Sequence, residues 1–118
     1  MAKNEYGVAL DCNGYAPSIV QPDADESCWL CGVTVGKLDR HEIFFGPYRE
    51  KSKRLGLWAT LCHESCHLGY GPFGSEAVHA HRPTDLRLKQ AAQRAAMMQY
   101  GWDTKTFIAQ FGRNYLEE

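Results

Sequence analysis

Two short segments decide the fold of this chain: CWLCG at residues 28–32 and LCHESCH at residues 61–67. A Cys-x-x-Cys pair followed by glycine is typical of a zinc knuckle, because its tight turn brings two thiolates together and glycine tolerates the backbone angles of that turn. The stretch between the two pairs leaves room for a β-hairpin. Four thiolates would form a closed tetrahedral site, which is the structural kind of zinc centre. The expected ligands of this zinc ion are Cys28, Cys31, Cys62 and Cys66.

The fourth ligand of this centre is open to alternatives, because the second pair has three intervening residues where two are more common. Cys62 and Cys66 would still converge if their segment begins a helical turn, since residues i and i+4 share one face of a helix. His63 or His67 could take the place of Cys66. The cysteines could also be buried free thiols, because cysteine is among the most often buried residue types. Two such pairs in so short a chain favour zinc.

Length and charge set limits on the function. The chain has 118 residues, which predicts one domain with a modest core, a size that a bound metal ion suits. The formal net charge is −1 at pH 7, so any contact with nucleic acid has to come from a local basic patch. Residues 1–12 lack the apolar core of a signal peptide, which argues against a secreted disulfide framework. No stretch is long enough to span a membrane, and we expect a cytoplasmic protein without a membrane partner.

We expect an α+β fold in two parts. Residues 1–27 are predicted to form an extended arm, because glycine and proline interrupt every periodic pattern there. Residues 28–118 are predicted to form the zinc-binding domain, with helices in its C-terminal part. The arm would be fixed to the domain by Tyr15, Ile19 and Val20. The expected strands are residues 33–35, 38–45 and 55–61. The expected helices span about 84–100, capped by Thr84 and ended by Gly101, and 104–111, capped by Asp103 and ended by Gly112.

A basic segment follows the second expected strand. Residues 48–54 hold four cations, namely Arg49, Lys51, Lys53 and Arg54. As a loop or a short helix, this segment could simply face the solvent. Beside a metal site it is a candidate nucleic-acid-binding surface, because clustered cations contact phosphates.

The five histidines lie in the same part of the chain as the cysteine pairs, at positions 41, 63, 67, 79 and 81. A single histidine is usually structural, but several around a cysteine scaffold favour a second metal site. The order of CWLCG, HEIFFG at residues 41–46 and LCHESCH resembles the HNH, or His-Me finger, nucleases. It is similar, more narrowly, to small HNH-like proteins encoded by phages and prophages. The resemblance extends to YAPSI at residues 15–19, to residues 77–79 and 85–89, and to FGRNYL at residues 111–116.

The resemblance implies a ββα-metal, treble-clef-like domain over residues 28–118 with a C-terminal helical extension. In such a fold a hairpin and a helix hold one catalytic divalent cation, such as Mg²⁺, Mn²⁺ or Ni²⁺, while the cysteine-bound zinc ion holds the frame. His41 corresponds to the first hairpin ligand, His67 to the helix ligand and His79 to a possible third ligand. His41 and Glu42 are the implied catalytic residues. The implied activity is that of a metal-dependent DNA endonuclease or nickase in the host-cell cytoplasm.

Two residues depart from the family pattern. Glu42 stands where many members have a second histidine, and no asparagine occurs near Leu57 and Trp58. If the register is shifted by one, His41 is the general base and Arg40 takes a ligand position where it cannot bind a cation. Two alternatives to a nuclease therefore remain. One is a degenerate HNH-like module that binds DNA or a host protein, for example a defence component, and the other is a zinc-stabilised accessory protein.

Overall fold

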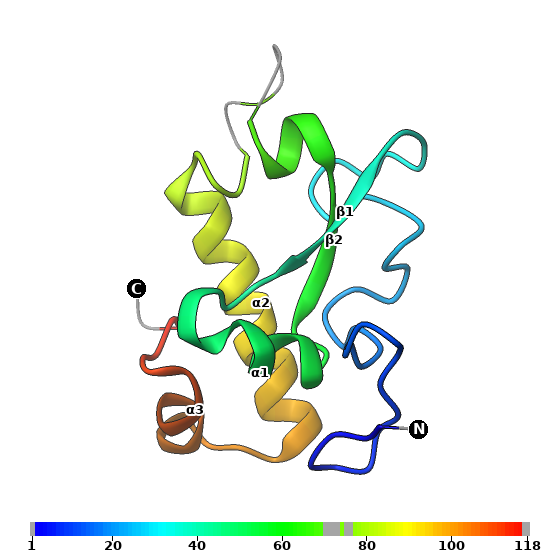
Figure 1. The fold of residues 1–118 in the computed structure, drawn as a ribbon. Coiled ribbons are helices and arrows are strands. Elements are labelled where there is room, and N and C mark those ends of the chain that lie inside the picture. Colours follow the sequence, from blue (N-terminus) through cyan, green and yellow to red (C-terminus); the bar gives the residue numbers. More distant parts are fainter. Residues whose placement is uncertain (1, 70–73, 75–76, 117–118) are drawn as a thin grey trace.

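The computed structural model describes residues 2–69, 74 and 77–116 (Figure 1). Residue 1 of the predicted arm and residues 117–118 of the predicted zinc-binding domain lie outside the described residues. The elements follow one another as β1 (Leu38–Glu42), η1 (Gly46–Tyr48), α1 (Arg49–Arg54), β2 (Trp58–Cys62), η2 (His63–His67), α2 (Arg82–Tyr100) and α3 (Thr104–Phe111). This order confirms a small α+β fold. None of the helices in the described residues is both long and apolar enough to pass through a membrane.

The sheet consists of β1 and β2, which pair antiparallel with His41 opposite Ala59 and Leu38 opposite Cys62. Side chains alternate between the faces of a strand, so Asp39 and His41 share one face of β1. The predicted strand at residues 33–35 is wrong. The carbonyl of Val33 accepts a hydrogen bond from the Cys28 amide at 2.9 Å, and the first cysteine turn therefore uses the backbone that a strand would need.

The basic segment forms η1 and α1 between the two strands. Ser52 on α1 is fully buried, and its hydroxyl is hydrogen-bonded both to a residue shortly after β1 and to the residue just before β2. Its hydroxyl donates to the carbonyl of Leu57 at 2.5 Å and accepts from the amide of Phe44 at 3.2 Å. The short helix is thereby fixed between the end of β1 and the start of β2.

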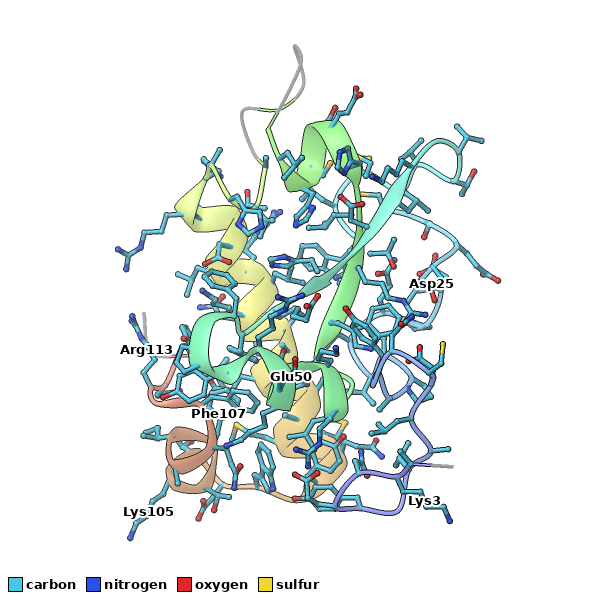
Figure 2. All side chains as sticks on the ribbon, in the orientation of Figure 1. Lys3, Asp25, Glu50, Lys105, Phe107 and Arg113 are labelled. Atoms are coloured by element: carbon cyan, nitrogen blue, oxygen red, sulfur yellow. The ribbon has the colours of Figure 1, made fainter. Side chains whose placement is uncertain are left out.

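Helices α2 and α3 close the core against the sheet. Helix α2 begins at Arg82, two residues before the predicted cap, and Thr84 is buried in its first turn. Gly101 and Gly112 end the two helices with positive φ angles of 69° and 89°, and Asp103 caps α3 as predicted. The ring of Phe44, next to β1, lies 5.6 Å from the ring of Phe107 on α3, which Figure 2 labels.

The arm contains no helix or strand element in residues 2–27, apart from an isolated bridge between Lys3 and Ala9. It lies along α1 and β2 through backbone hydrogen bonds. The amide of Ala16 donates to the carbonyl of Lys53 at 3.1 Å, and the amide of Ile19 donates to that of Gly56 at 3.0 Å. The ring of Tyr15 contacts the ring of Trp58 edge-on at 5.4 Å, which bears out its predicted role in fixing the arm.

Candidate metal centres

The two cysteine pairs meet at one end of the sheet. One sulfur from each of the four residues lies within 4.8 Å of the other three, and this group could hold a metal ion. Cys28 and Cys66 are buried, whereas Cys31 is exposed. The fifth cysteine, Cys12, is exposed and belongs to neither of the groups described here.

Local backbone geometry explains why the sulfurs converge. Gly32 has a φ of 78°, and its amide donates to the carbonyl of Cys28 at 2.9 Å, so the first pair closes into a tight turn. The second pair converges because η2 is a single helical turn capped by Cys62, whose sulfur accepts from the amide of Cys66 at 3.3 Å. The amide of Trp29 donates to the carbonyl of Thr60 at 2.7 Å and joins the first turn to β2.

The three alternatives for the fourth ligand of the cysteine centre differ in the direction of their side chains. Cys66 is the residue that completes the group of sulfurs, whereas His63 and His67 turn their Nδ1 atoms toward Asp39. Burial, together with hydrogen bonds from neighbouring thiols, raises the pKa of the Cys66 thiol well above its usual value. A bound cation would offset that shift, because coordination favours the thiolate.

A second group is formed by His41 from β1, His67 from η2 and His79 from the segment before α2. One ring nitrogen from each residue lies within 4.8 Å of the other two. The ring centroid of His41 lies 5.3 Å from that of His67 and 5.0 Å from that of His79. The Nε2 atoms of His67 and His79 are 3.1 Å apart. Three imidazoles that converge in this way are a donor set for a transition-metal ion.

His41 is the most buried member of this group, with 3% of its surface exposed. Its Nε2 atom is buried and has no hydrogen-bond partner among the described residues. Burial, with the nearby charges of His67, His79 and Lys89, lowers the pKa of His41 to about 3. Its imidazole is therefore neutral at physiological pH, which is the form that binds metal ions.

Asp39 was not among the predicted site residues, although it lies on the same face of β1 as His41. Its Oδ2 atom is 2.5 Å from Nδ1 of His63 and 2.8 Å from Nδ1 of His67. Burial opposes ionisation of this carboxyl, but the hydrogen bonds to His67 and His63 outweigh burial and lower its pKa. The period-2 pattern of a strand could have placed Asp39 beside His41, because the two residues are separated by one position.

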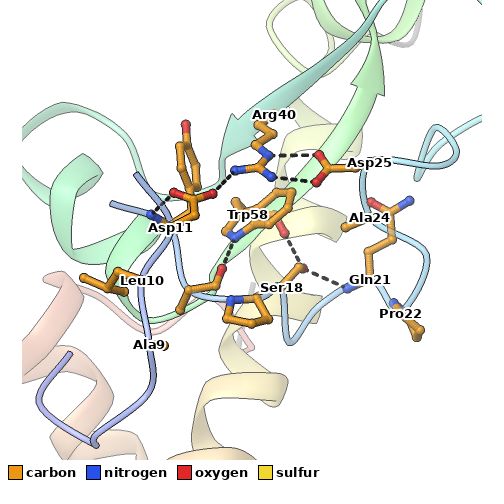
Figure 3. Close-up of a pocket in the computed structure, with 13 residues that line it drawn as sticks. Ala9, Leu10, Asp11, Ser18, Gln21, Pro22, Ala24, Asp25, Arg40 and Trp58 are labelled. Atoms are coloured by element: carbon orange, nitrogen blue, oxygen red, sulfur yellow. Dashed lines mark hydrogen bonds and ion pairs between the residues drawn. The ribbon is translucent and has the colours of Figure 1, made fainter. Parts of the chain in front are cut away.

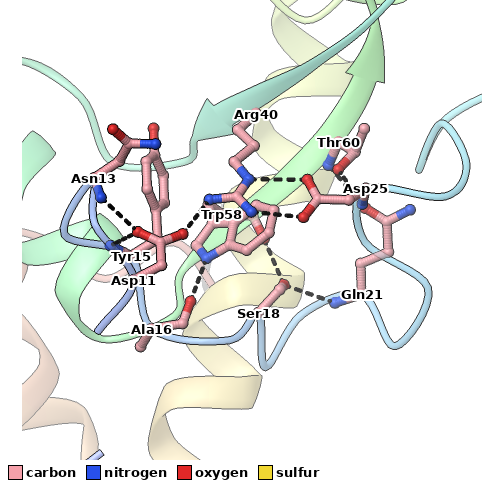
Figure 4. Close-up of polar contacts among 10 residues, drawn as sticks. All are labelled: Asp11, Asn13, Tyr15, Ala16, Ser18, Gln21, Asp25, Arg40, Trp58 and Thr60. Carbon is pink, nitrogen blue, oxygen red and sulfur yellow. Dashed lines mark hydrogen bonds and ion pairs between the residues drawn. The ribbon is translucent and has the colours of Figure 1, made fainter. Parts of the chain in front are cut away.

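Arg40 and Glu42 alternate with His41 along β1, and both residues border the pocket that contains the three histidines. The guanidinium of Arg40 pairs with Asp11 at 2.7 Å and with Asp25 at 2.6 Å, and it lies over the rings of Tyr15 and Trp58 (Figures 3 and 4). The close-ups show this guanidinium between the two carboxylates of the arm. Arg40 therefore fixes the arm to the sheet, since both of its ion pairs are with carboxylates of the arm.

Glu42 forms an ion pair with Arg49 at the edge of the pocket that contains the three histidines. The Nε atom of Arg49 donates to Oε1 of Glu42 at 2.6 Å, and Glu42 is 8% exposed whereas the Arg49 side chain is 63% exposed. An open pocket of about 510 Å³ lies here. It is lined by Arg40, His41, Glu42, Phe45, Gly46, Arg49, His67 and His79.

The four cations of the basic segment do not form one surface. Of the four, Arg49 borders the histidine pocket. Lys51 donates to the carbonyl of Gln110 at 2.9 Å, and Arg54 pairs with Glu5. Lys53 lies over the ring of Tyr15, with 14% of its side chain exposed.

The geometry thus yields two groups that could hold metal ions, one of four thiols and one of three imidazoles. The turn after β2 contributes to both, because Cys66 and His67 are adjacent in η2. No family model, no curated protein and no solved structure matches this chain.

Proposed function

We propose that this protein is a metal-dependent nuclease of HNH type, with a structural zinc ion at the four cysteines and a catalytic divalent ion at the three histidines. The observation that carries this proposal is the convergence of His41, His67 and His79 on an open pocket next to the cysteine group. A hairpin followed by a turn that bears both a cysteine and a histidine ligand supports the treble-clef-like ββα-metal fold. The target would be a phosphodiester bond of DNA in the cytoplasm, with the phage origin that the sequence resemblance implies.

The residues present fit the two ions. Four thiolates match the tetrahedral preference of zinc and leave no open position, as a structural site requires. The imidazole group is different, because three ligands leave positions for water and substrate. The buried Nε2 atom of His41, which lacks a partner in the described part of the chain, is a suitable ligand atom. Imidazole ligands favour a transition metal such as Mn²⁺ or Ni²⁺, and Mg²⁺ would need phosphate and water oxygens to complete its shell.

The residues around the pocket would have different roles in the reaction. The bound ion would stabilise the negative charge that develops on the phosphoryl group and on the leaving 3′ oxygen. Arg49, exposed at the rim, would bind a non-bridging phosphate oxygen and so leave Glu42. The freed Glu42 carboxylate would accept a proton as water attacks phosphorus. The bond from phosphorus to the 3′ oxygen then breaks, and the leaving oxygen takes a proton from solvent.

The pair between Glu42 and Arg49 also favours a second candidate function. Nε of Arg49 donates to Oε1 of Glu42 at 2.6 Å, and as long as the pair persists this oxygen is not free to take a proton from water. If the pair persists with nucleic acid bound, the protein is a non-catalytic HNH-like module that binds DNA or a host protein. The two functions differ in whether phosphodiester bonds are cleaved.

Supercoiled plasmid provides the test. We expect the purified protein to nick plasmid with Mg²⁺, Mn²⁺ or Ni²⁺, and His41→Ala and His67→Ala to lower the rate by at least about a hundredfold. His81→Ala is the matched control, because His81 bonds to Thr84 and lies outside the imidazole group. Nicking that survives both ligand variants would refute the assignment of the active site. DNA binding without cleavage under all three ions would favour the non-catalytic module.

A further inference from the structure

One carboxylate oxygen joins the two candidate metal centres. Oδ2 of Asp39 is within hydrogen-bond distance of two imidazoles, those of His63 and His67, at 2.5 Å and 2.8 Å. An ionised carboxylate has no proton to donate, so both rings donate from Nδ1. The Asp39 side chain is 18% exposed, and the paired His67 side chain is 17% exposed. This contact is therefore largely shielded from water, where hydrogen bonds to a charged group are strong.

The contact determines which nitrogen His67 offers to the imidazole group. With Nδ1 bonded to Asp39, the Nε2 atom of His67 faces Nε2 of His79 at 3.1 Å. A metal-binding histidine commonly donates its other ring N–H to a carboxylate, which fixes the tautomer and the ring orientation. Asp39 is in the place of such a carboxylate, and it does not belong to the group of possible ligands itself.

Oδ2 of Asp39 is also linked to the cysteine centre, because both of its imidazole partners are next to cysteines in the sequence. His63 directly follows Cys62, and His67 directly follows Cys66, within the single turn of η2. Asp39 therefore holds the neighbour of each cysteine of the second pair to β1. Any rearrangement of the turn at the cysteine centre would move His67 relative to His41.

We propose that Asp39 is a positioning residue that couples the cysteine centre to the histidine centre by fixing His67. This inference rests on the proposed metal binding at His41, His67 and His79. Asp39 would not be a ligand of the ion, because it lies outside the group of three imidazoles. It would hold the Nε2 atom of His67 toward a bound ion, because its Oδ2 atom accepts a hydrogen bond from Nδ1 of the same ring.

The test compares two Asp→Asn variants, each prepared with the structural zinc retained. Asp39→Asn removes the charge beside His67, and Asp11→Asn, the matched control, removes a carboxylate that pairs with Arg40 of the same strand. The first readout is titration with Co²⁺, which reports the second site by its absorption. We expect Asp39→Asn to weaken Co²⁺ binding about 10–100-fold and Asp11→Asn to leave it unchanged, with one zinc per chain in both.

The second readout is the tautomer of His67, measured from its ring ¹⁵N shifts without added Co²⁺. We expect the Nδ1-protonated form in the wild type and in Asp11→Asn, and a shift toward the Nε2-protonated form in Asp39→Asn. A merely structural ion pair would change stability without changing the tautomer. Unchanged Co²⁺ affinity together with an unchanged tautomer in Asp39→Asn would overturn the inference. A wild type that binds no Co²⁺ beyond the zinc site would overturn the proposed function, and an unchanged tautomer alone would then overturn the role of Asp39.

Discussion

Replacing His41 by leucine should make the protein more stable while it removes the proposed activity. His41 is 3% exposed, and its Nε2 atom has no hydrogen-bond partner in the described part of the chain. A buried polar group without a partner costs about 1–3 kcal/mol. Leucine is of similar size and has no polar atom, so it removes this cost. Some packing between rings is lost, because the His41 ring centroid lies 5.0 Å from that of His79. We therefore expect a net gain of about 1–2 kcal/mol in the free energy of unfolding.

Urea unfolding without added divalent ions measures this gain. A domain of this size has an m-value of about 1–3 kcal/mol/M, so the midpoint of His41→Leu should rise by roughly 0.3–2 M. The same experiment with Mn²⁺ or Ni²⁺ tests the ligand role. An ion at a hundred times its dissociation constant should stabilise the wild type by about 2.7 kcal/mol and leave His41→Leu unchanged.

Two results would refute this reasoning. A loss of stability in His41→Leu without added ions would show that the imidazole has a structural partner. Equal stabilisation of both proteins by the added ion would show that the ion binds elsewhere. The expected pattern, a more stable and inactive variant, is that of a residue retained for function at the expense of stability.

Three further predictions concern the cysteine centre, the basic segment and the arm. Cys62→Ser should leave the protein without its zinc and without a cooperative thermal transition, measured by metal analysis and circular dichroism; a metal-free variant that melts like the wild type would contradict this. Arg49→Ala should weaken DNA binding and reduce its salt dependence, whereas Lys51→Ala, whose ammonium is bonded to a backbone carbonyl, should not; equal effects in fluorescence anisotropy would count against the pocket as the binding site. Gly56→Ala should destabilise the protein by about 1–3 kcal/mol in urea unfolding, because Gly56 has a positive φ. Its added Cβ would also lie 2.4 Å from the carbonyl oxygen of Pro17, so a neutral effect would show that the arm is not held there.

Local rules in the sequence predicted the features that depend on neighbouring residues. Gly101 and Gly112 end the helices, and Asp103 caps α3, because these positions depend only on backbone geometry within a few residues. The same rules failed at residues 33–35, which have high strand propensity. There the closed turn of the first cysteine pair, a tertiary feature, determines the backbone hydrogen bonds.

The contacts that shape the site depend on partners far away in the chain, and local patterns cannot identify these. Strand alternation places Asp39 beside His41, but it does not say that His63 and His67 bond to the same oxygen. Likewise, the charges of the basic segment were visible, but their directions were not. The short helix points Lys51 toward α3 and Arg54 toward the arm, and so distributes a run of cations over several surfaces.

The contact between the arm and the end of α2 has a consequence for the order of events during synthesis. The ring of Tyr6 stacks on that of Tyr100 at 4.3 Å, and its hydroxyl accepts from the indole of Trp102, 96 residues further along the chain. At about 5–20 residues per second, the ribosome needs roughly 5–20 s to make that stretch. All the candidate metal ligands, the last of which is His79, are made before Tyr100. Every candidate metal ligand therefore precedes, in the order of synthesis, the two aromatic residues that Tyr6 contacts.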